Sequence, residues 1–273
     1  MVTIVLTTSN QVSEVCLATP IALSAPTTKS MPFNTFNANH HERFTPACIV
    51  FAGAIHMAGR AGLGRTSLQF SVIKNSGAQW GAAIAMYGGI ERMGATLTFM
   101  NSVVELSNSA QVSTSAKRDG GALYVSRNCT VVMRDSVIRL NRSPRISAFA
   151  ISLHPQSRMV VTAQNTSFVA NKVLQPQGIN VQVYPVGAAL STAGQTAGWL
   201  DLSLQECTFK DNAVRLLGGD AILFQNVYAT TSKGSGVVSV RIRNTTIVPR
   251  PGRKMSGETV YVGGAPGACR MWL

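Results

Sequence analysis

Carboxylates are the first residues to examine, because cleavage of a glycosidic bond needs two facing carboxylates, or acidic residues that hold Ca²⁺ beside a proton acceptor. The 273-residue chain has only 11 Asp and Glu, and no two are adjacent or separated by a single residue. Five Asp fall at or near expected corners, where Asp commonly forms turns: Asp119, Asp135, Asp201, Asp211 and Asp220. Because a fold can bring distant residues together, a carbohydrate-active lyase or hydrolase stays as the alternative to a non-catalytic protein.

Metal-binding chemistry has little support in the sequence. The histidines lack the spacing of a zinc site, and the chain contains no Cys-x-x-Cys pair. They are His40, His41, His56 and His154. Neighbouring residues of an extended strand point in opposite directions, so we expect the His40-His41 pair in a solvated loop. No metal and no cofactor are expected.

Cysteine usage leaves the redox compartment open. The cysteines are Cys16, Cys48, Cys129, Cys207 and Cys269. In a secreted protein this odd number means at least one free thiol or an intermolecular bond, and the sequence does not define the pairing. We expect Cys129 and Cys207 to be buried small apolar residues.

Four Asn-x-Ser/Thr sequences could accept N-linked glycans in a eukaryotic secreted protein. They begin at Asn128, Asn141, Asn165 and Asn244. Short sequons also arise by chance in a chain rich in Ser, Thr and Asn. Asn141 is followed by Ser143-Pro144 and belongs to the repeat described below. The glycosylation candidates are therefore Asn128, Asn165 and Asn244.

The formal net charge is +13, and the basic residues form clusters along the chain. The candidates for an anionic-ligand patch are Arg134, Arg139, Arg142, Arg145, Arg241 and Arg243. On stacked strands such residues could attract acidic glycans or anionic headgroups, whereas the alternative is a diffuse cationic surface that aids solubility. Nucleic acid is not expected, because no helix-turn-helix, zinc-finger or RRM signature accompanies the charge and only 7% of residues are aromatic.

The overall composition is that of a folded chain. Charged residues make up 13% and hydrophobic residues 45%, which argues against disorder. No apolar run reaches the ~18 residues of a transmembrane helix. No Lys or Arg precedes Lys29, so the usual signal-peptide pattern is missing. Either the protein is not exported by a signal peptide, or the sequence is a piece of a longer surface protein. We favour the second interpretation.

The elements that must position these residues follow from an internal repeat. An apolar residue followed three positions later by Asn recurs along the chain, with the apolar residue shifted by one in the third unit. The recurrent residues are Asn39, Asn75, Asn108, Asn141, Asn171 and Asn212. After each of them, small residues lead into a short apolar strand, as in Gly120-Gly121-Ala122-Leu123. One ordered set of landmarks per unit is typical of a solenoid.

Between these landmarks apolar and polar residues alternate, as in Ala95–Phe99 and Leu200–Leu204. A period of two predicts strands with one buried face, so the fold is predicted to be an all-β solenoid of about seven coils. At ~4.8 Å per coil, the stack would be about 34 Å long. The predicted organisation is an irregular segment or cap at 1–35, a repeat domain at 36–262 and a tail at 263–273. A β-sandwich is the alternative fold, but it predicts no matched order of landmarks.

The recurrent Asn has a physical role in such a solenoid. Asn tolerates the left-handed conformation that a tight corner needs, and stacked Asn amides can bond to one another along the axis. We therefore predict an Asn ladder, made of the six recurrent residues. The Gly-Gly-Ala step is expected at a second corner, where a side chain would clash.

Three segments, Gly120-Gly121-Ala122-Leu123, Phe168-Val169-Ala170-Asn171 and Phe209-Lys210-Asp211-Asn212, carry a family resemblance. This pattern resembles the repeats of chlamydial polymorphic outer-membrane proteins and of related surface proteins in protists and algae. That family pairs Gly-Gly-Ala plus an aliphatic residue with Phe-x-x-Asn. The resemblance implies a right-handed parallel β-helix of the pectin-lyase-like class, serving as a surface-exposed passenger or adhesin.

The expected function is a non-catalytic structural or adhesive module of a cell-surface or secreted protein. Acidic glycans, or other cell-surface molecules, are the expected partners of its basic face. The alternatives are a carbohydrate-active enzyme and a non-functional fragment of a larger surface protein. Acidic residues gathered on one exposed sheet would favour the enzyme, whereas an uninterrupted basic or Ser/Thr/Asn face would favour adhesion.

Overall fold

The computed structural model describes residues 2–6, 29–32, 35–37, 55–59, 65–69, 72–74, 83–88, 95–108, 121–143, 148–154, 157–174, 186–187, 189–192, 198–214, 218–219, 222–227, 237–248, 260–264 and 269–272. Within these residues all regular structure is β-strand, and there is no helix. The prediction of an all-β chain is confirmed for this part of the protein.

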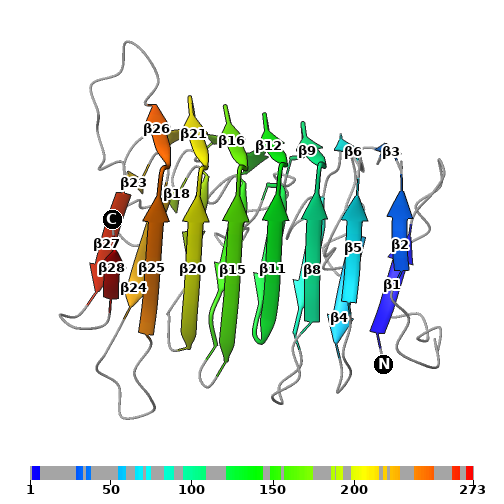
Figure 1. The fold of residues 1–273 in the computed structure, drawn as a ribbon, viewed down its shortest axis with the longest axis horizontal. Coiled ribbons are helices and arrows are strands. Elements are labelled where there is room, and N and C mark those ends of the chain that lie inside the picture. The colour runs from blue at the N-terminus through cyan, green and yellow to red at the C-terminus, as the bar shows by residue number, and fades with distance from the viewer. Residues whose placement is uncertain are drawn as a thin grey trace.

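Three long sheets organise the described strands (Figure 1). Sheet A contains β1 (Val2–Leu6), β4 (Ile55–Gly59), β7 (Ile84–Tyr87), β10 (Leu123–Ser126), β14 (Phe149–Ser152), β19 (Leu190–Thr192), β24 (Ile222–Val227) and β27 (Val260–Gly264). Sheet B contains β2 (Lys29–Pro32), β5 (Arg65–Gln69), β8 (Ala95–Met100), β11 (Cys129–Arg134), β15 (Arg158–Gln164), β20 (Trp199–Gln205), β25 (Val237–Arg243) and β28 (Cys269–Trp272).

Sheet C contains β3 (Thr35–Asn37), β6 (Val72–Lys74), β9 (Val103–Glu105), β12 (Val137–Arg139), β16 (Ser167–Val169), β21 (Thr208–Lys210) and β26 (Thr246–Val248). Two short sheets complete the described strands. Sheet D contains β13 (Arg142–Ser143), β17 (Lys172–Val173) and β22 (Ala213–Val214). Sheet E contains β18 (Val186–Gly187) and β23 (Gly218–Gly219).

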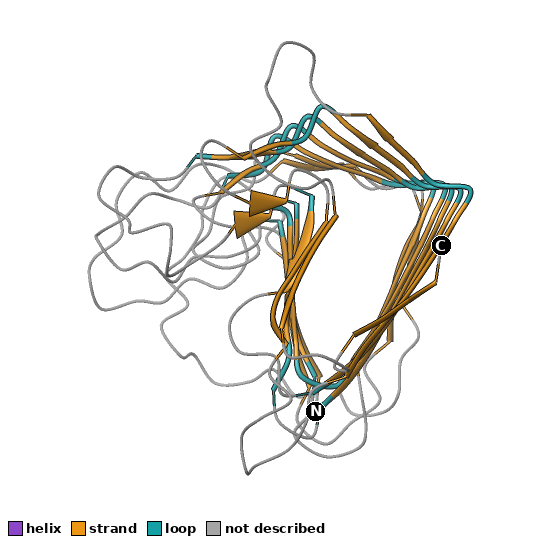
Figure 2. Cartoon of the chain, turned by 90° about the vertical axis from the view of Figure 1, so that its left-hand side faces the viewer, coloured by secondary structure: helices purple, strands orange, loops and turns teal. Residues whose placement is uncertain are grey.

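The chain visits the long sheets in the repeating order A, B, C, and strands one circuit apart lie side by side. Cys129 of β11, for example, pairs with Ala95 of β8 and with Met159 of β15. All pairings among the described strands are parallel except that of β1 with β4. Viewed along the stacking direction, the strands superpose on three sides of an elongated ring (Figure 2). This arrangement is compatible with a parallel β-helix, whereas the strands of a β-sandwich are mostly antiparallel.

The core lies inside the ring and follows from the alternation in the sequence. In β8, β11, β15 and β20 every second residue is buried. One inward row of sheet B is fully buried and consists of Leu97, Val131, Val161, Leu202 and Val240. Burial of one such side chain contributes about 1.5–3 kcal/mol. Because each row is completed by neighbouring circuits, the circuits stabilise one another.

Sheet C shows how identical residues stack when circuits lie in register. Phe168 and Phe209 are direct partners, both are buried, and their ring centroids are 4.8 Å apart with 4° between the ring planes. That separation matches the ~4.8 Å spacing of paired strands, so parallel register itself sets the ring stacking. The recurrent apolar position before Asn is thus a core position of sheet C.

Nine of the ten left-handed non-glycine residues in the described segments form two rows of corners, and the tenth, Arg127, lies between β10 and β11. The row between sheets B and C consists of Asn101, Asp135, Asn165, Glu206 and Asn244, with φ from 46° to 54°. The row that follows sheet C consists of Leu106, Leu140, Ala170 and Asp211, with φ from 53° to 57°. A single left-handed residue redirects the chain sharply, which is how it leaves one sheet for the next.

Paired strands occur outside the predicted repeat range of 36–262. At the N-terminal side, β1 pairs with β4 and β2 pairs in parallel with β5. At the C-terminal side, β28 pairs in parallel with β25. These strands carry no Asn or Gly-Gly-Ala landmark, so the repeat pattern could not indicate them.

Candidate functional site

Asn141, Asn171 and Asn212 form a hydrogen-bonded series along the stacking direction. Nδ2 of Asn141 donates to Oδ1 of Asn171 at 3.0 Å, and Nδ2 of Asn171 donates to Oδ1 of Asn212 at 2.9 Å. The backbone N–H groups of Asn141 and Asn171 donate to the same two oxygens, at 3.2 and 3.1 Å. All three side chains are buried. A buried amide is costly unless it is hydrogen-bonded, so the series accounts for the polar residue in the interior.

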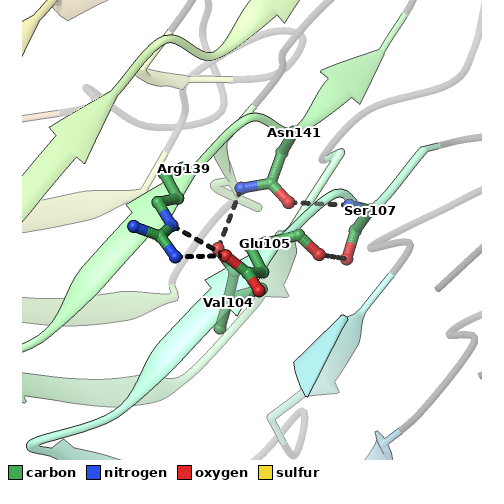
Figure 3. A network of polar contacts seen from close by, with 5 residues as sticks. All are labelled: Val104, Glu105, Ser107, Arg139 and Asn141. Carbon is green, nitrogen blue, oxygen red and sulfur yellow. Dashed lines mark hydrogen bonds and ion pairs between the residues drawn. The ribbon is translucent and has the colours of Figure 1, made fainter. Parts of the chain in front are cut away.

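The next position of this series is occupied by Ser107 rather than by Asn108 (Figure 3). The N–H of Ser107 donates to Oδ1 of Asn141 at 3.0 Å, whereas Asn108 lies one residue further on, opposite Arg142. The sequence interval placed Asn108 in the ladder, but sheet register decides the partner. Two other residues assigned to the ladder lie outside the described part of the chain: Asn39 and Asn75.

The left-handed residue at this corner is not the ladder Asn itself but the residue before it. Leu140 and Ala170, with φ of 57° and 53°, precede Asn141 and Asn171. The turn made by the left-handed residue directs the following side chain inward, where it meets the equivalent side chain of the next circuit. The corner and the ladder are therefore two adjacent positions with separate tasks.

A second stacked series follows the other row of corners, and sequence reasoning missed it. Its described members are Ser102, Ser136, Thr166, Cys207 and Thr245. The hydroxyl of Ser136 donates to the carbonyl of Arg134 at 2.7 Å, and its oxygen accepts the N–H of Ser102 at 3.2 Å. The signal in the sequence is Asn, Asp or Glu followed by a small polar residue or Cys, once per circuit.

This corner also provides a structural reason for two sequons. Asn165 and Asn244 are exposed left-handed residues, and the Thr that follows each belongs to the second series. Nδ2 of Asn165 donates to Oδ1 of Asp135 at 2.7 Å. Oδ1 of Asn128 accepts the N–H of Arg158 at 2.7 Å. Asn-Thr-Ser/Thr thus serves the corner geometry whether or not a glycan is attached.

The basic candidates are distributed over several sheets. Arg134, Arg241 and Arg243 are exposed on sheet B, Arg139 lies on sheet C and Arg142 on sheet D. Nη2 of Arg139 lies 2.7 Å from Oε2 of Glu105, and its Nε donates to the same oxygen at 2.7 Å (Figure 3). Arg139 is therefore neutralised by its neighbour. One further candidate, Arg145, lies outside the described residues.

The outward face of sheet B gathers small hydroxyl and basic side chains into three registered rows. The first row is Thr96, Thr130, Val160, Asp201 and Ser239. The second is Thr98, Val132, Thr162, Ser203 and Arg241. The third is Met100, Arg134, Gln164, Gln205 and Arg243. Among these positions Asp201 is the one acidic residue, against three arginines.

An exposed tryptophan at the edge of this face escaped the sequence analysis. Trp199 is 57% exposed and begins β20, in register with Arg158 and Val237. A signal was present, because Trp199 has the same parity as Asp201 and Ser203 in the alternating segment. We refer below to the outward rows of sheet B together with Arg158, Trp199 and Val237 as the sheet B face.

The described carboxylates do not assemble into a metal site or a facing pair on the sheet B face. Asp135 and Asp211 occupy left-handed corners, and Asp201 lies inside β20 rather than at a corner. Asp135 and Glu206 belong to the same row of corners, separated by Asn165. No group of three or more His, Cys, Asp or Glu suited to a metal ion occurs in the described segments. Two of the turn candidates are outside them: Asp119 and Asp220.

Burial moves the pKa values of Cys129, Cys207 and His154 away from their ordinary values. Cys129 and Cys207 are free and buried, and burial raises the pKa of the Cys129 thiol to about 12. Burial likewise raises the pKa of the Cys207 thiol. Partial burial lowers the pKa of His154, and repulsion from Arg127 adds to this effect. The thiols are thus inert core groups, as expected from their apolar surroundings.

Over the part of the chain with described structure, no helix has the length and apolar character needed to cross a bilayer. The resemblance to polymorphic outer-membrane proteins rests on the repeat residues alone. Comparison with models of protein families, with curated proteins and with solved structures finds no match to this chain.

Proposed function

We propose that the chain is a right-handed parallel β-helix acting as a non-catalytic adhesive module of a cell-surface or secreted protein. The repeating order of sheets A, B and C and the one-circuit register support the helix. The surface role is supported by the family resemblance of the repeats. The module binds acidic glycans through the sheet B face.

The observation that carries this proposal is the composition of the sheet B face. Its registered rows present mostly Ser, Thr, Gln and Arg, and they also include Asp201 and the apolar residues Met100, Val132 and Val160. Paired strands lie ~4.8 Å apart and outward residues of one strand ~7 Å apart, so these groups form a regular array. Hydroxyl and guanidinium donors at this regular spacing suit a repeating anionic polymer, because several of its units can meet a donor at the same time.

The proposal is tested by binding of the full chain to immobilised polygalacturonate, with neutral dextran as the reference surface. We expect binding to the polyanion, no binding to dextran, and dissociation as NaCl rises toward about 1 M, where screening is nearly complete. Absence of binding to polygalacturonate and to dextran sulfate would refute the glycan-binding role.

Paired charge variants locate the face. Arg241→Ser with Arg243→Ser removes two exposed arginines from sheet B, and we expect binding to weaken about fivefold. The matched control, Arg139→Ser with Arg142→Ser, removes the same charge from sheets C and D and should leave affinity nearly unchanged. Equal weakening in both variants would indicate attraction by diffuse charge rather than by the sheet B face.

A further inference from the structure

Five large apolar residues are exposed among those whose exposure the structure describes, and Trp199 is the aromatic one. The other exposed large apolar residues are Leu106, Leu140, Val237 and Val248. Leaving a tryptophan 57% exposed forfeits much of the free energy that burial of its large apolar surface would give. Single exposed apolar residues need no explanation, but this one is part of a registered group on the sheet B face.

The neighbours of Trp199 are fixed by strand register. Arg158 lies on one side in β15 and Val237 on the other in β25, each one strand spacing of ~4.8 Å away. Arg158 is exposed, and Val237 is 37% exposed. The next outward row carries Val160, Asp201 and Ser239 in the same three strands. By register, the positions around Trp199 are therefore one arginine, two valines, one aspartate and one serine.

The backbone beneath this group is held tightly. The N–H of Trp199 donates to the carbonyl of Ser157 at 2.8 Å, and the hydroxyl of Ser157 donates to the carbonyl of His154 at 2.6 Å. A Cβ on Gly198 would lie 2.5 Å from the carbonyl oxygen of His154, so only glycine fits there. The N–H of Val237 donates to Gly198 at 3.1 Å. The backbone of Trp199 is thus hydrogen-bonded on both sides of Gly198, so this backbone needs no reordering when a ligand binds.

We propose that Trp199 and Arg158 form a subsite for one anionic pyranose unit of the glycan, an inference that rests on the proposed function. The negative face of the indole ring attracts the C–H groups of a sugar ring packed on it. Arg158, one strand away, pairs with a carboxylate or sulfate substituent of the same unit, because guanidinium groups bind such anions bidentately. The polar residues of the next row accept and donate hydrogen bonds to its hydroxyl groups.

A single-stranded nucleic acid would use similar groups but in another pattern. Sequence-tolerant binding of single strands relies on successive aromatic platforms along a basic groove. Among the sheet B residues whose exposure the structure describes, Trp199 is the one exposed aromatic residue, and it stands among small hydroxyl side chains. Trp272 of β28 is two strands away, in register with Arg241 rather than with Trp199, so the two are not successive platforms. Hydroxyl groups complement the hydroxyl groups of a sugar polymer, so the anionic glycan is the favoured ligand.

The test compares variants of the full chain for binding to polygalacturonate, dextran sulfate and neutral dextran. Trp199→Thr removes the ring but keeps strand propensity, and we expect binding to both polyanions to weaken about tenfold or more. Trp199→Phe keeps an aromatic face and should retain most of the affinity. Val248→Thr is the matched control, because it removes an exposed apolar residue from sheet C and should bind like the wild type.

Arg158→Gln distinguishes the two anion sources. A larger loss on polygalacturonate than on dextran sulfate assigns the subsite to carboxylates, and the reverse result assigns it to sulfates. Tryptophan fluorescence provides a second readout that does not depend on affinity. We expect ligand addition to change the fluorescence of the wild type and of Val248→Thr, and this change to be lost in Trp199→Phe.

Different outcomes separate this inference from the proposed function. Unchanged binding of Trp199→Thr, with weakened binding of the Arg241→Ser and Arg243→Ser variant, overturns the subsite and leaves the proposed function standing. No binding of the wild type to either polyanion overturns both. Tighter, Trp199-dependent binding to oligothymidylate than to either glycan overturns the subsite in favour of a nucleic-acid site.

Discussion

At the scale of single residues, some left-handed corners are occupied by leucine, a residue type for which this backbone conformation is unfavourable. Leu106 and Leu140 are left-handed, with φ of 55° and 57°, and both are substantially exposed. A left-handed backbone costs an L-residue about 1–2 kcal/mol, whereas Asn bears it more easily. The chain therefore stores avoidable strain in residues whose side chains contribute little burial.

Leu140→Asn is expected to stabilise the protein by up to about 1 kcal/mol, because the left-handed backbone costs Asn less than Leu. The midpoint of urea unfolding measures the effect. Val248→Asn is the control, since Val248 is similarly exposed but is not among the positive-φ residues. Equal or lower stability of Leu140→Asn relative to the wild type would contradict a strained corner.

The thiol of Cys129 should be almost inert in the folded protein. At pH 8 a pKa of about 12, against an ordinary value of 9.0, lowers the thiolate fraction about a thousandfold. Peptide-resolved iodoacetamide labelling should show protection of Cys129 in the native protein and full labelling in urea. Because the native pKa is the higher one, stability from this group is complete below pH 9 and declines as pH rises toward 12. Rapid native labelling at pH 8 would contradict the buried position.

At this scale, the sequence predicted a residue's role where that role depends on neighbouring residues in the chain. The burial of Cys129 follows from its place in the alternating segment of β11, whereas Cys207 lies at a corner between β20 and β21, where its small apolar side chain is what predicted burial. The shift from Asn108 to Ser107 had a local signal, because Ser107 and not Asn108 follows the apolar residue Val104 by three positions, as Asn141 follows Ile138. The pairing of Arg139 with Glu105 had none, because it joins residues 34 positions apart.

At the scale of elements, the Asn series ties one circuit to the next. Oδ1 of Asn171 accepts two hydrogen bonds from Asn141, and its Nδ2 donates to Asn212 and to the carbonyl of Ile138 at 3.0 Å. Replacement by an apolar residue of similar shape removes all four. It also leaves buried donors of Asn141 without this acceptor, which costs more than a lost surface contact.

Asn171→Leu is accordingly expected to destabilise the protein by about 3 kcal/mol, the scale of unpaired buried polar groups. Equilibrium urea unfolding, or the melting temperature where unfolding is reversible, reports the change. Gln205→Leu replaces an exposed amide of β20 and should change stability by less than about 0.5 kcal/mol. Similar stability of the two variants would exclude an interior ladder at Asn171.

The sequence revealed one of the two stacked series, and the difference has a physical cause. Phe168-x-x-Asn171 and Phe209-x-x-Asn212 repeat both residue types, since the short side chain of Asn supplies an amide donor and an acceptor close to the backbone and the Phe rings stack. The second series needs only a small group able to hydrogen-bond locally, so Ser, Thr and Cys alternate there. A position that tolerates several residue types leaves no single-letter repeat.

At the scale of the whole molecule, alternation and landmarks were sufficient to predict an all-β chain of stacked units. The described strands extend that pattern into segments without landmarks, because β2 and β28 need only one registered neighbour each. The distribution of the arginines over sheets B, C and D was beyond sequence reasoning, since it depends on where each corner falls. The same dependence placed Trp199 beside Arg158, residues that are distant in the sequence.

The sheet B face exists only if strands one circuit apart are parallel neighbours. In sheet B, Val161 pairs with Val131 on one side and with Leu202 on the other. The three belong to β11, β15 and β20, and no turn between consecutive strands would bring them together. An antiparallel meander or sandwich would instead place consecutive strands, such as β11 and β12, beside each other.

The most direct measurement is therefore the set of backbone nuclear Overhauser contacts of Val161 in the isotopically labelled full chain. Cross-peaks from Val161 to residues next to both Val131 and Leu202, in the slanted pattern of parallel strands, are expected. Contacts between Val131 and Leu202 themselves should be absent, because they lie two strand spacings, about 9.6 Å, apart. Contacts of β11 with β12 in an antiparallel pattern would contradict the stacked parallel fold and the face built on it.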